Sequence, residues 1–455
     1  MPERLSARRI LSLVSDAGTF AELPVPAGER APDGPLGWQG YDASRARAAE
    51  RTGEEESVVC GTARVEGTPA VLIAFEFGFL GGSLGERTGD RLEAAYTHAR
   101  EHRLPVVPLI ATGGSRMQEG MLALTQLQRV ARQSALTREV GLAQIAVLRD
   151  PTTGGGWATL GAGADVILAL PGAQVGFAGS RVRPPGADPA AYTAEAQVAV
   201  GAADAVVPPR ELRGVLGAWL RLLARPSGAP DPEPAPVPAA LGAAGLPGTG
   251  WEAVGRARSG GRPRAGAYLD AYFTHRVRIS GDRCGGTDPE GMLCGFGEHG
   301  GRTVAFAAQT GTATRPAGYR TAARLIRLAG RLGVPVLTLV DTPGAANDAE
   351  AERQAAGAAI AEVFAAVAAA RVPVTTLVVG EGGSGGALAL AAPGNTWAAP
   401  DSYFSVIAPE LAAAILKRPP QEVEATAAQL RIRPQDLVGL GVVRGIVRPA
   451  DHPGG

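Results

Sequence analysis

Short apolar runs alternate with longer amphipathic stretches along this chain of 455 residues. The runs at 145–148 and 374–379 each meet a cluster of glycines and then a stretch rich in alanine and leucine, which indicates a buried strand, a tight turn and a helix. Longer amphipathic stretches at 87–103 and 350–370 predict helices between these units. Strands that alternate with helices predict an α/β architecture with largely parallel strand pairing.

This pattern occurs twice in the chain at a constant offset of 230 residues. Three strand-and-turn units keep the offset, and one match alone would be weak, whereas three in register indicate a duplicated domain. The matched segments are PVVPLIATGG and PVLTLVDTPG (105–114 and 335–344), DPTTGGG and GEGGSGG (150–156 and 380–386), and AQVGFA and YFSVIA (173–178 and 403–408).

The two copies are separated by a stretch of different composition. Residues 226–250 (PSGAPDPEPAPVPAALGAAGLPGTG) are dense in proline, alanine and glycine and have little apolar periodicity, which is typical of an extended linker. A chain of this length also exceeds what one hydrophobic core supports. We therefore predict an N-terminal domain at 1–225, a linker at 226–250 and a C-terminal domain at 251–455.

Composition and charge exclude several classes of function. The chain is 45% hydrophobic and its formal net charge is zero, so it can fold and has no general attraction to nucleic acid or to an anionic membrane. Lys417 is the only lysine, which excludes a phosphate-binding GxxxxGK[ST] loop. A biotin-carrying domain needs a lysine beside a methionine, and no methionine of the chain precedes one. Any biotin must therefore arrive on another polypeptide.

The remaining compositional features predict a cytoplasmic protein without a resident metal. The N-terminal residues carry early charges and no cleavable apolar segment, and no apolar run reaches 18 residues. Three cysteines, Cys60, Cys284 and Cys294, do not make a disulfide framework and are too few for a four-cysteine zinc site. We expect them to be buried free thiols.

The glycine turns are the candidate chemical sites. A strand that ends in glycines and enters a helix presents backbone N–H groups without intrahelical partners, and glycine lets a ligand approach them closely. Such a site stabilises a negative charge that develops on oxygen, and the loss of one donor typically costs on the order of 3 kcal/mol of transition-state stabilisation. A single glycine turn is more often tight packing, but two at equivalent places favour two oxyanion sites and two carbonyl partners. The candidates are Gly154 and Gly155 in the first copy, and Gly383, Ser384, Gly385 and Gly386 in the second.

The same motifs carry a family resemblance over nearly the whole chain apart from the linker. The first half resembles the β subunit of bacterial acetyl-CoA carboxylase carboxyltransferase in FGFLGGSLGE (77–86), GGSRMQEG (113–120), DPTTGG (150–155) and VGFAGSRV (175–182). The second half resembles the α subunit in GYRTAARLIRLA (318–329), DTPGA (341–345), GEGGSGGALAL (380–390) and YFSVIAPE (403–410). The chain thus looks like a fusion of the β and α subunits.

The resemblance implies two tandem crotonase-like (ClpP/crotonase) β-β-α superhelical domains and an active site between a β-type and an α-type domain. It implies a biotin-dependent acyl-CoA carboxyltransferase that uses carboxybiotin on a separate biotin carboxyl carrier protein, charged by a biotin carboxylase subunit. Carboxybiotin would release carbon dioxide with its ureido oxygen on the second-half turn. The thioester enolate, on coenzyme A or an acyl carrier, would be held by the first-half turn. A homodimer or higher homo-oligomer is expected because such a site is shared between protomers.

Residues close to these motifs are candidates for substrate binding. Arginine binds phosphate through a bidentate fork, so some arginines could meet the phosphates of coenzyme A, although each could equally be a surface charge or a helix-face partner. Trp157, beside the first glycine turn, either shapes the acyl pocket or belongs to the core. The candidates are Gly113, Gly114, Arg116, Trp157, Phe177, Arg315 and Arg320.

The chain departs from the family in ways that keep alternatives open. It lacks the four-cysteine zinc ribbon of the β subunit, and the α-type half is trimmed at 309–317 and 345–353. A malonyl-thioester decarboxylase on the same fold and a non-catalytic scaffold therefore stay open as alternatives. A serine hydrolase is a weaker one. Residues 382–386 fit G-x-S-x-G, but His452 is the only histidine that follows them.

Overall fold

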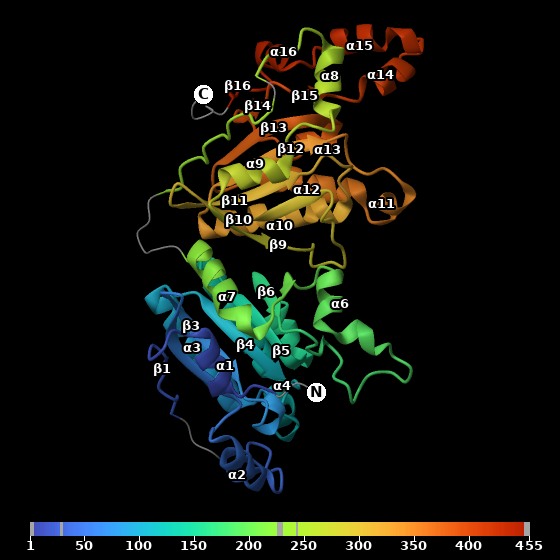
Figure 1. The fold of residues 1–455 in the computed structure, drawn as a ribbon. Helices are drawn as coiled ribbons and strands as arrows, with labels where there is room; N and C mark the ends of the chain where they lie inside the picture. The colour runs from blue at the N-terminus through green and yellow to red at the C-terminus, as the bar shows by residue number, and fades with distance from the viewer. Residues whose placement is uncertain (1–3, 28–30, 225–230, 243, 450–455) are drawn as a thin grey trace. The chain divides into compact units, whose positions relative to one another are not determined.

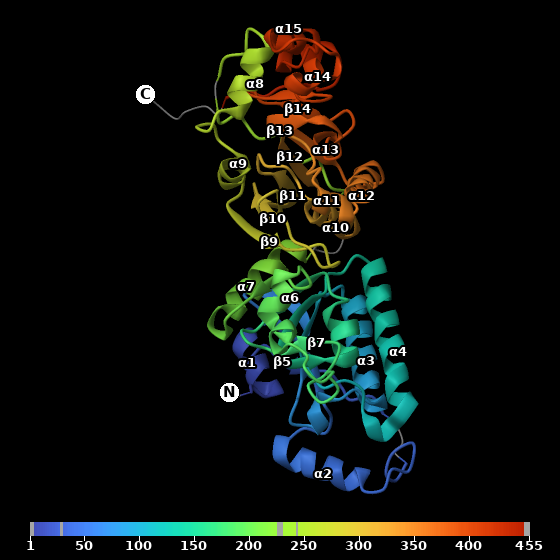
Figure 2. The ribbon, with the colours of Figure 1, turned by 90° about the vertical axis from the view of Figure 1, so that its right-hand side faces the viewer.

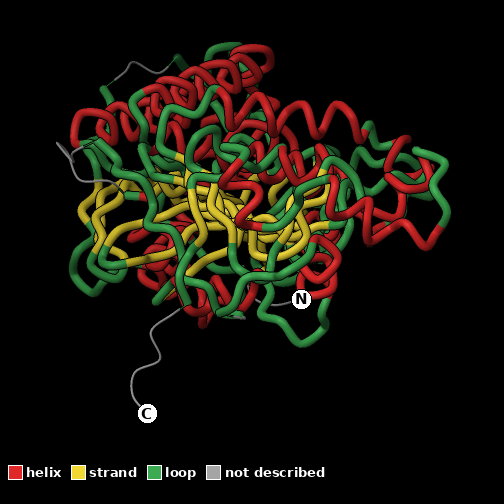
Figure 3. Tube along the Cα trace, turned by 90° about the horizontal axis from the view of Figure 1, so that it is seen from above, coloured by secondary structure: helices red, strands yellow, loops and turns green. Residues whose placement is uncertain are grey.

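A computed structural model of the chain describes residues 4–27, 31–224, 231–242 and 244–449. It divides into two compact units, Met1–Ala229 and Pro230–Gly455, and each is an α/β unit built on one sheet (Figure 1). Strands lie between layers of helices (Figure 3). The architecture predicted from the alternation of apolar and amphipathic segments is confirmed.

The first unit contains an eight-stranded sheet that is mainly parallel. Its strands lie in the order β1-β2-β3-β4-β5-β6-β8. β7 pairs with the last residues of β5, which follow those that pair with β6. β1, β2 and β3 pair in antiparallel fashion, and every later pair is parallel. β4 is buried along its whole length, as expected for a parallel strand covered on both faces. The strands are β1 (Ala21–Glu22), β2 (Val58–Val65), β3 (Thr68–Phe75), β4 (Val106–Thr112), β5 (Ile145–Thr153), β6 (Val166–Ala169), β7 (Val175–Gly176) and β8 (Ala205–Val206).

Helices cover both faces of this sheet. Figure 2 shows α1 and α7 on one side of the strands and α3 and α4 on the other, while α2 lies at the end of the unit. The predicted helix at 87–103 is α3. The helices are α1 (Ala7–Val14), α2 (Tyr41–Thr52), α3 (Glu86–His102), α4 (Gly120–Glu139), α5 (Gly154–Gly156), α6 (Ala194–Ala199) and α7 (Pro209–Leu223).

The second unit repeats this topology in its own sheet. The strand order is β16-β14-β13-β12-β11-β10-β9, with β15 paired to β13. Again the two pairs at one end are antiparallel and the others are parallel. The strands are β9 (His275–Ile279), β10 (Met292–His299), β11 (Arg302–Gln309), β12 (Val336–Thr342), β13 (Val374–Gly383), β14 (Thr396–Ala398), β15 (Tyr403–Ser405) and β16 (Gly445–Ile446).

In the second unit α10 and α12 cover one side of the sheet and α9 the other (Figure 2). α10 begins with Pro316 and is followed by Gly333, which has a left-handed φ of 67°, so its bounds follow the usual proline and glycine signals. The helix predicted at 350–370 is divided into α11 and α12 because Ala355 adopts a left-handed φ of 59°. The helices are α8 (Gly250–Arg258), α9 (Ala265–Tyr272), α10 (Pro316–Leu332), α11 (Ala349–Arg353), α12 (Ala356–Ala368), α13 (Ser384–Leu388), α14 (Pro409–Ile415), α15 (Val423–Gln429) and α16 (Pro434–Gly439).

Strand register confirms the repeat for two of the three matched segments. Leu109 pairs with Val147 in the first sheet, and the residues 230 positions later, Leu339 and Leu377, pair in the second. The third match is wrong by one residue. Thr152 pairs with Val175, whereas its counterpart Gly382 pairs with Phe404, an offset of 229 for the later strand. The second copy therefore has one residue fewer than the first between its glycine turn and this strand.

The segment predicted as a linker lies partly outside the described residues. Its described parts are 231–242 and 244–250, and both belong to the second unit. Residues 231–242 contain no helix and form a β-bridge between Ala240 and Pro449. Ala235 and Ala240 are buried in the core of that unit. The Ala235 carbonyl accepts a hydrogen bond from the Thr375 hydroxyl at 2.8 Å. These contacts anchor the segment along the sheet, so the second unit begins well before α8.

Candidate functional site

The first glycine turn joins β5 to α5. Gly154 has a left-handed φ of 63°, which glycine adopts without strain, and the chain continues into a π-helical turn, Trp157–Gly161. Gly155 and Gly156 are buried, and a Cβ atom on them would lie 2.4 Å from Leu127 and 2.3 Å from Thr112. A Cβ atom at either position would therefore have to displace a neighbouring side chain. The first amides of the turn have no intrahelical acceptor, and the Gly154 amide donates to the Phe177 carbonyl instead.

The second glycine turn joins β13 to α13 and is more exposed than the first. Ser384 stands 230 positions after Gly154 and has nearly the same φ, 60°, although it is not glycine. Ser384 and Gly385 are both exposed, and a Cβ atom on Gly385 would meet no atom within 4 Å. The two turns thus share a left-handed residue at the same point of the repeat, and a side chain on Gly385 would enter open space.

Each glycine turn lies against the loop that follows the neighbouring strand. In the first unit a Cβ atom on Gly154 would lie 3.2 Å from the Cα atom of Gly114. In the second unit a Cβ atom on Gly383 would lie 2.1 Å from the carbonyl oxygen of Pro343. The structure therefore brings Gly113 and Gly114, predicted as substrate-binding residues, beside the first glycine turn.

Two threonines shape these loops, and the sequence prediction did not include them. The Thr112 hydroxyl accepts a hydrogen bond from the Gly114 amide at 3.0 Å, and the Thr342 hydroxyl accepts one from the Gly344 amide at 3.1 Å. Both glycines have positive φ, 112° and 141°. Because the two threonines are identical residues at the offset of 230, the repeat itself could have identified them.

Arg116 is buried, with 1% of its surface exposed, and its guanidinium forms an ion pair with Glu56. It also donates to Ser83 and Tyr41. Burial acts to raise the pKa of Glu56, but the Arg116 guanidinium outweighs it, so that the pKa stays below its ordinary value. A guanidinium engaged in this way has no free face for a phosphate, so the geometry favours a structural role over contact with coenzyme A.

A second buried ion pair lies behind the glycine turn of the second unit. The Asp341 carboxylate, fully buried at the end of β12, accepts from Arg262 Nη2 at 2.5 Å and from the Glu381 amide at 3.1 Å. Burial raises the pKa of Asp341 although Arg262 opposes the shift. Because Glu381 lies on β13, the carboxylate ties together the two strands that carry the loop and the turn.

The other predicted binding residues have differing environments. Trp157 is packed in the core of the first unit. Phe177 is 74% exposed, and its carbonyl accepts from the Gly154 amide at 3.0 Å, so its ring lies free beside the first turn. Arg315 is exposed and pairs with Asp348 at 2.9 Å. Arg320 is half-buried and bonds to Asp282 and to the Gln354 carbonyl. Phe177 and Arg315 are therefore the accessible members of this set.

Two of the cysteines fit the prediction and one does not. Cys60 and Cys294 are buried, and burial raises the pKa of each thiol to about 12. Cys284 is exposed, so the prediction of a buried thiol is wrong there. It lies in the loop before β10, where its amide donates to Asp282, and such a loop residue has no core to enter.

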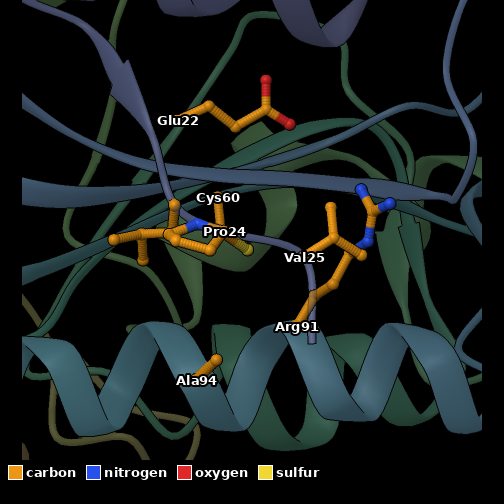
Figure 4. Close-up of a pocket in the computed structure, with 7 residues that line it drawn as sticks. Glu22, Pro24, Val25, Cys60, Arg91 and Ala94 are labelled. Carbon is orange, nitrogen blue, oxygen red and sulfur yellow. The ribbon is translucent and has the colours of Figure 1, made fainter. Parts of the chain in front are cut away.

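Other sites in the described residues are few. No group of three or more histidine, cysteine or acidic side chains with metal-binding geometry occurs there, and no described helix is long and apolar enough to cross a membrane. His452 lies outside the described residues. A small pocket beside β1 in the first unit shares no lining residue with the glycine turns (Figure 4). It is lined by Glu22, Leu23, Pro24, Val25, Cys60, Arg91 and Ala94.

Comparison with known proteins assigns a family to each half. Residues 38–195 match the carboxyl transferase domain family, and residues 248–452 match the acetyl co-enzyme A carboxylase carboxyltransferase-like family. The chain is 39% identical to the acetyl-coenzyme A carboxylase carboxyl transferase subunits beta/alpha of Saccharopolyspora erythraea, covering 98% of this chain and 80% of that protein. It is 40% identical to the protein of the same name in Salinispora arenicola, covering 99% and 84%.

Among solved structures, the chain is similar to the transcarboxylase 12S subunit from a hexamer crystallised with methylmalonyl-coenzyme A and methylmalonic acid. The TM-score is 0.79 at 21% identity, covering 98% of this chain and 88% of that one. At this identity the likeness establishes the fold, and it extends over both units.

Proposed function

Because the chain belongs to the acetyl-CoA carboxylase carboxyltransferase family, we propose that it moves a carboxyl group between biotin and an acyl thioester through two backbone oxyanion sites. The observation that carries the proposal is the pair of equivalent turns. Gly154 and Ser384 share a left-handed φ at the same point of two repeated units, at the end of a buried strand. Two such sites suit a reaction with two carbonyl partners.

The first turn holds the enolate of the acyl thioester. The Gly154 amide donates to the Phe177 carbonyl, so we assign the Gly155 amide, beside the loop of Gly113 and Gly114, as the donor to this oxygen. Phe177, exposed beside the turn, contacts the acyl or pantetheine portion. Arg315 is the exposed one of the three arginines predicted to bind substrate, and it serves as a phosphate contact if the thioester is carried on coenzyme A.

The second turn, Gly383 to Gly386, holds the ureido oxygen of biotin. The exposed backbone at Ser384 and Gly385 and the open space above Gly385 leave room for a planar ring, so the residues present fit the group. Carboxybiotin supplies the carbon dioxide and then a nitrogen base for the carbon next to the thioester. In this arrangement the chain's own contribution is to orient both partners and to stabilise negative charge on their oxygens.

The partners follow from the same assignment. No methionine of the chain precedes its only lysine, so the biotin is carried by a separate biotin carboxyl carrier protein and charged by a biotin carboxylase subunit. The chain forms a homodimer or larger homo-oligomer in the cytoplasm.

The direct test is to mix the purified chain with malonyl-CoA and to measure acetyl-CoA with and without free biotin. The proposal expects acetyl-CoA to form at a rate that rises with biotin concentration and to be negligible without it. Equal consumption of malonyl-CoA without biotin would assign the protein as a decarboxylase. Absence of any reaction in both arms would support the scaffold.

The side chain of Ser384 should matter little if the backbone performs the chemistry. Ser384→Ala is expected to keep biotin-dependent turnover within about twofold of wild type, since the amide remains. Ser384→Gly should raise the free energy of unfolding by about 0.5 kcal/mol, because the relief of left-handed strain slightly exceeds the entropic cost of glycine. Steady-state kinetics and thermal melts check both variants. Complete loss of activity in a folded Ser384→Ala protein would instead indicate a serine nucleophile.

A further inference from the structure

A buried charged cluster lies beside the first glycine turn, and the chemistry described above does not use it. Its members are Arg116, Glu56, Glu119 and Arg45, with exposures of 9% or less, together with the buried phenol of Tyr41. The two arginines and two glutamates balance in charge. Glu56 precedes β2, Tyr41 and Arg45 lie on α2, and Arg116 and Glu119 lie in the loop after β4. The cluster therefore links three segments that are distant in sequence.

Arg116 saturates its hydrogen-bonding capacity inside this cluster. Its Nη1 atom donates to Glu56 Oε2 at 3.1 Å, and its Nη2 atom bonds to Glu56 Oε1 and donates to the Ser83 carbonyl at 2.7 Å. Its Nε atom donates to the Ser83 hydroxyl at 3.1 Å. The fork therefore fixes the segment around Ser83 against the start of β2.

This segment in turn fixes the loop that faces the first glycine turn. The Leu84 amide donates to the Gly114 carbonyl at 2.9 Å, and the Arg116 amide donates to the Leu84 carbonyl at 2.8 Å. The Gly113 amide donates to the Gly81 carbonyl at 2.9 Å. Any shift of the Arg116 fork is therefore transmitted to Gly113 and Gly114, which lie against Gly154.

The second unit shows that the loop does not need a charged side chain in order to fold. Ala346 stands 230 positions after Arg116, and its amide donates to the Thr314 carbonyl at 2.9 Å in the same pattern. The Thr314 amide donates to the Gly344 carbonyl at 3.2 Å, as Leu84 does to Gly114. Buried ion pairs are often no more stabilising than apolar replacements because their desolvation is costly. A buried pair that the equivalent loop lacks therefore calls for a role other than folding.

We propose that Arg116 and Glu56 are positioning residues of the first oxyanion site. The ion pair sets the placement of the loop of Gly113 and Gly114 against Gly154 without touching the substrate itself. This inference rests on the proposed function, because its effect is read in turnover of the thioester. Tyr41, whose hydroxyl donates to Glu119 at 2.5 Å and accepts from Arg116 at 3.1 Å, makes helix α2 part of the same support.

The test is the double variant Arg116→Met with Glu56→Gln, assayed in biotin-dependent conversion of malonyl-CoA. Removing one positive and one negative charge together keeps the net charge of the cluster at zero, and we expect a cooperative thermal melt. Arg45 and Glu119 each lose an ion-pair partner, so the melting temperature should fall. The value of kcat should fall between about tenfold and a hundredfold because a small misplacement of an oxyanion donor has effects of this size. The KM for malonyl-CoA should stay within about twofold, since neither residue contacts it.

Arg91→Met is the matched control. Arg91 is another buried arginine of the first unit, which donates to the Val58 carbonyl at 3.1 Å and makes no bond to the glycine loop, so its kcat should match wild type. Arg116→Lys keeps the positive charge but cannot bond to both carboxylate oxygens of Glu56. Its kcat tests the positioning role if the double variant fails to melt cooperatively. Wild-type kcat in either folded variant, or a raised KM with unchanged kcat, overturns the positioning role. An inactive wild-type protein overturns the proposed function instead, and this inference with it.

Discussion

The variant Gly385→Val should lose at least about a hundredfold in kcat for biotin-dependent transfer while its melting temperature stays at the wild-type value. Gly385 is exposed, its φ lies outside the left-handed region, and a Cβ atom there would meet nothing within 4 Å. The substitution therefore adds a branched side chain above the amides of the second turn without disturbing the packing. Blocked access to these amides removes the stabilisation of charge on one carbonyl partner.

Gly357→Val provides the matched control for this variant. Gly357 is the second residue of α12, as Gly385 is of α13, and it is also exposed with no atom within 4 Å of a Cβ position. Steady-state kinetics and thermal melts of both variants should show lost turnover only for Gly385→Val. Full activity of Gly385→Val would show that the second turn is not a ligand site. Gly155 is a poorer probe, because a side chain there would enter the core at Leu127.

The variant Arg262→Met should lower the free energy of unfolding by about 3–5 kcal/mol at neutral pH, because it removes the closer and buried ion-pair partner of the buried Asp341 carboxylate. Arg262 also donates to the carbonyls of Ala257 and Val379, so its removal also loses hydrogen bonds to the residue that precedes the end of α8 and to β13. Because Asp341 lies directly before the loop beside the second glycine turn, turnover should fall as well. Chemical denaturation followed by circular dichroism measures the change in stability.

The pH dependence of this loss has a defined sign. Burial holds the pKa of Asp341 above its ordinary value, and removal of Arg262 should raise it further. A raised folded-state pKa favours the protonated folded protein, so the variant recovers stability as pH falls and loses it as pH rises through that pKa. Arg264→Met is the control, since Arg264 lies 3.6 Å from Asp341 and is 40% exposed; it should cost less than about 1 kcal/mol. A pH-independent deficit in Arg262→Met would contradict this account.

The fold could be predicted from the sequence where local signals and burial agree. β4 and β12 are mainly apolar and are buried along their whole length, and each ends in a threonine and a glycine-containing turn. The one-residue slip after the second turn was not predictable, because the strands β7 and β15 are too short to fix a register by pattern. Ala355 adopts a left-handed conformation, which alanine rarely does, so the sequence did not predict the break between α11 and α12.

The candidate site divides in the same way. The glycine turns could be predicted because their chemistry depends on backbone amides, and glycine clusters after apolar runs indicate turns with accessible backbone. Arg116 looked like a surface charge or a phosphate ligand because its partner, Glu56, is 60 positions away and only the folded chain brings them together. Phe177 and Trp157, both aromatic residues near one motif, proved to be exposed and buried respectively, which the sequence pattern could not distinguish.

The most direct test of the assignment of two turns to two carbonyls is the affinity of Gly385→Val for acetyl-CoA, measured by isothermal titration calorimetry beside wild type. Acetyl-CoA binds without reacting when carboxybiotin is absent, so the measurement isolates the thioester site. If the second turn serves biotin, the Kd should stay within about twofold of wild type although biotin-dependent transfer is lost. A Kd weakened by as much as the turnover would place the thioester on the second turn and contradict the account.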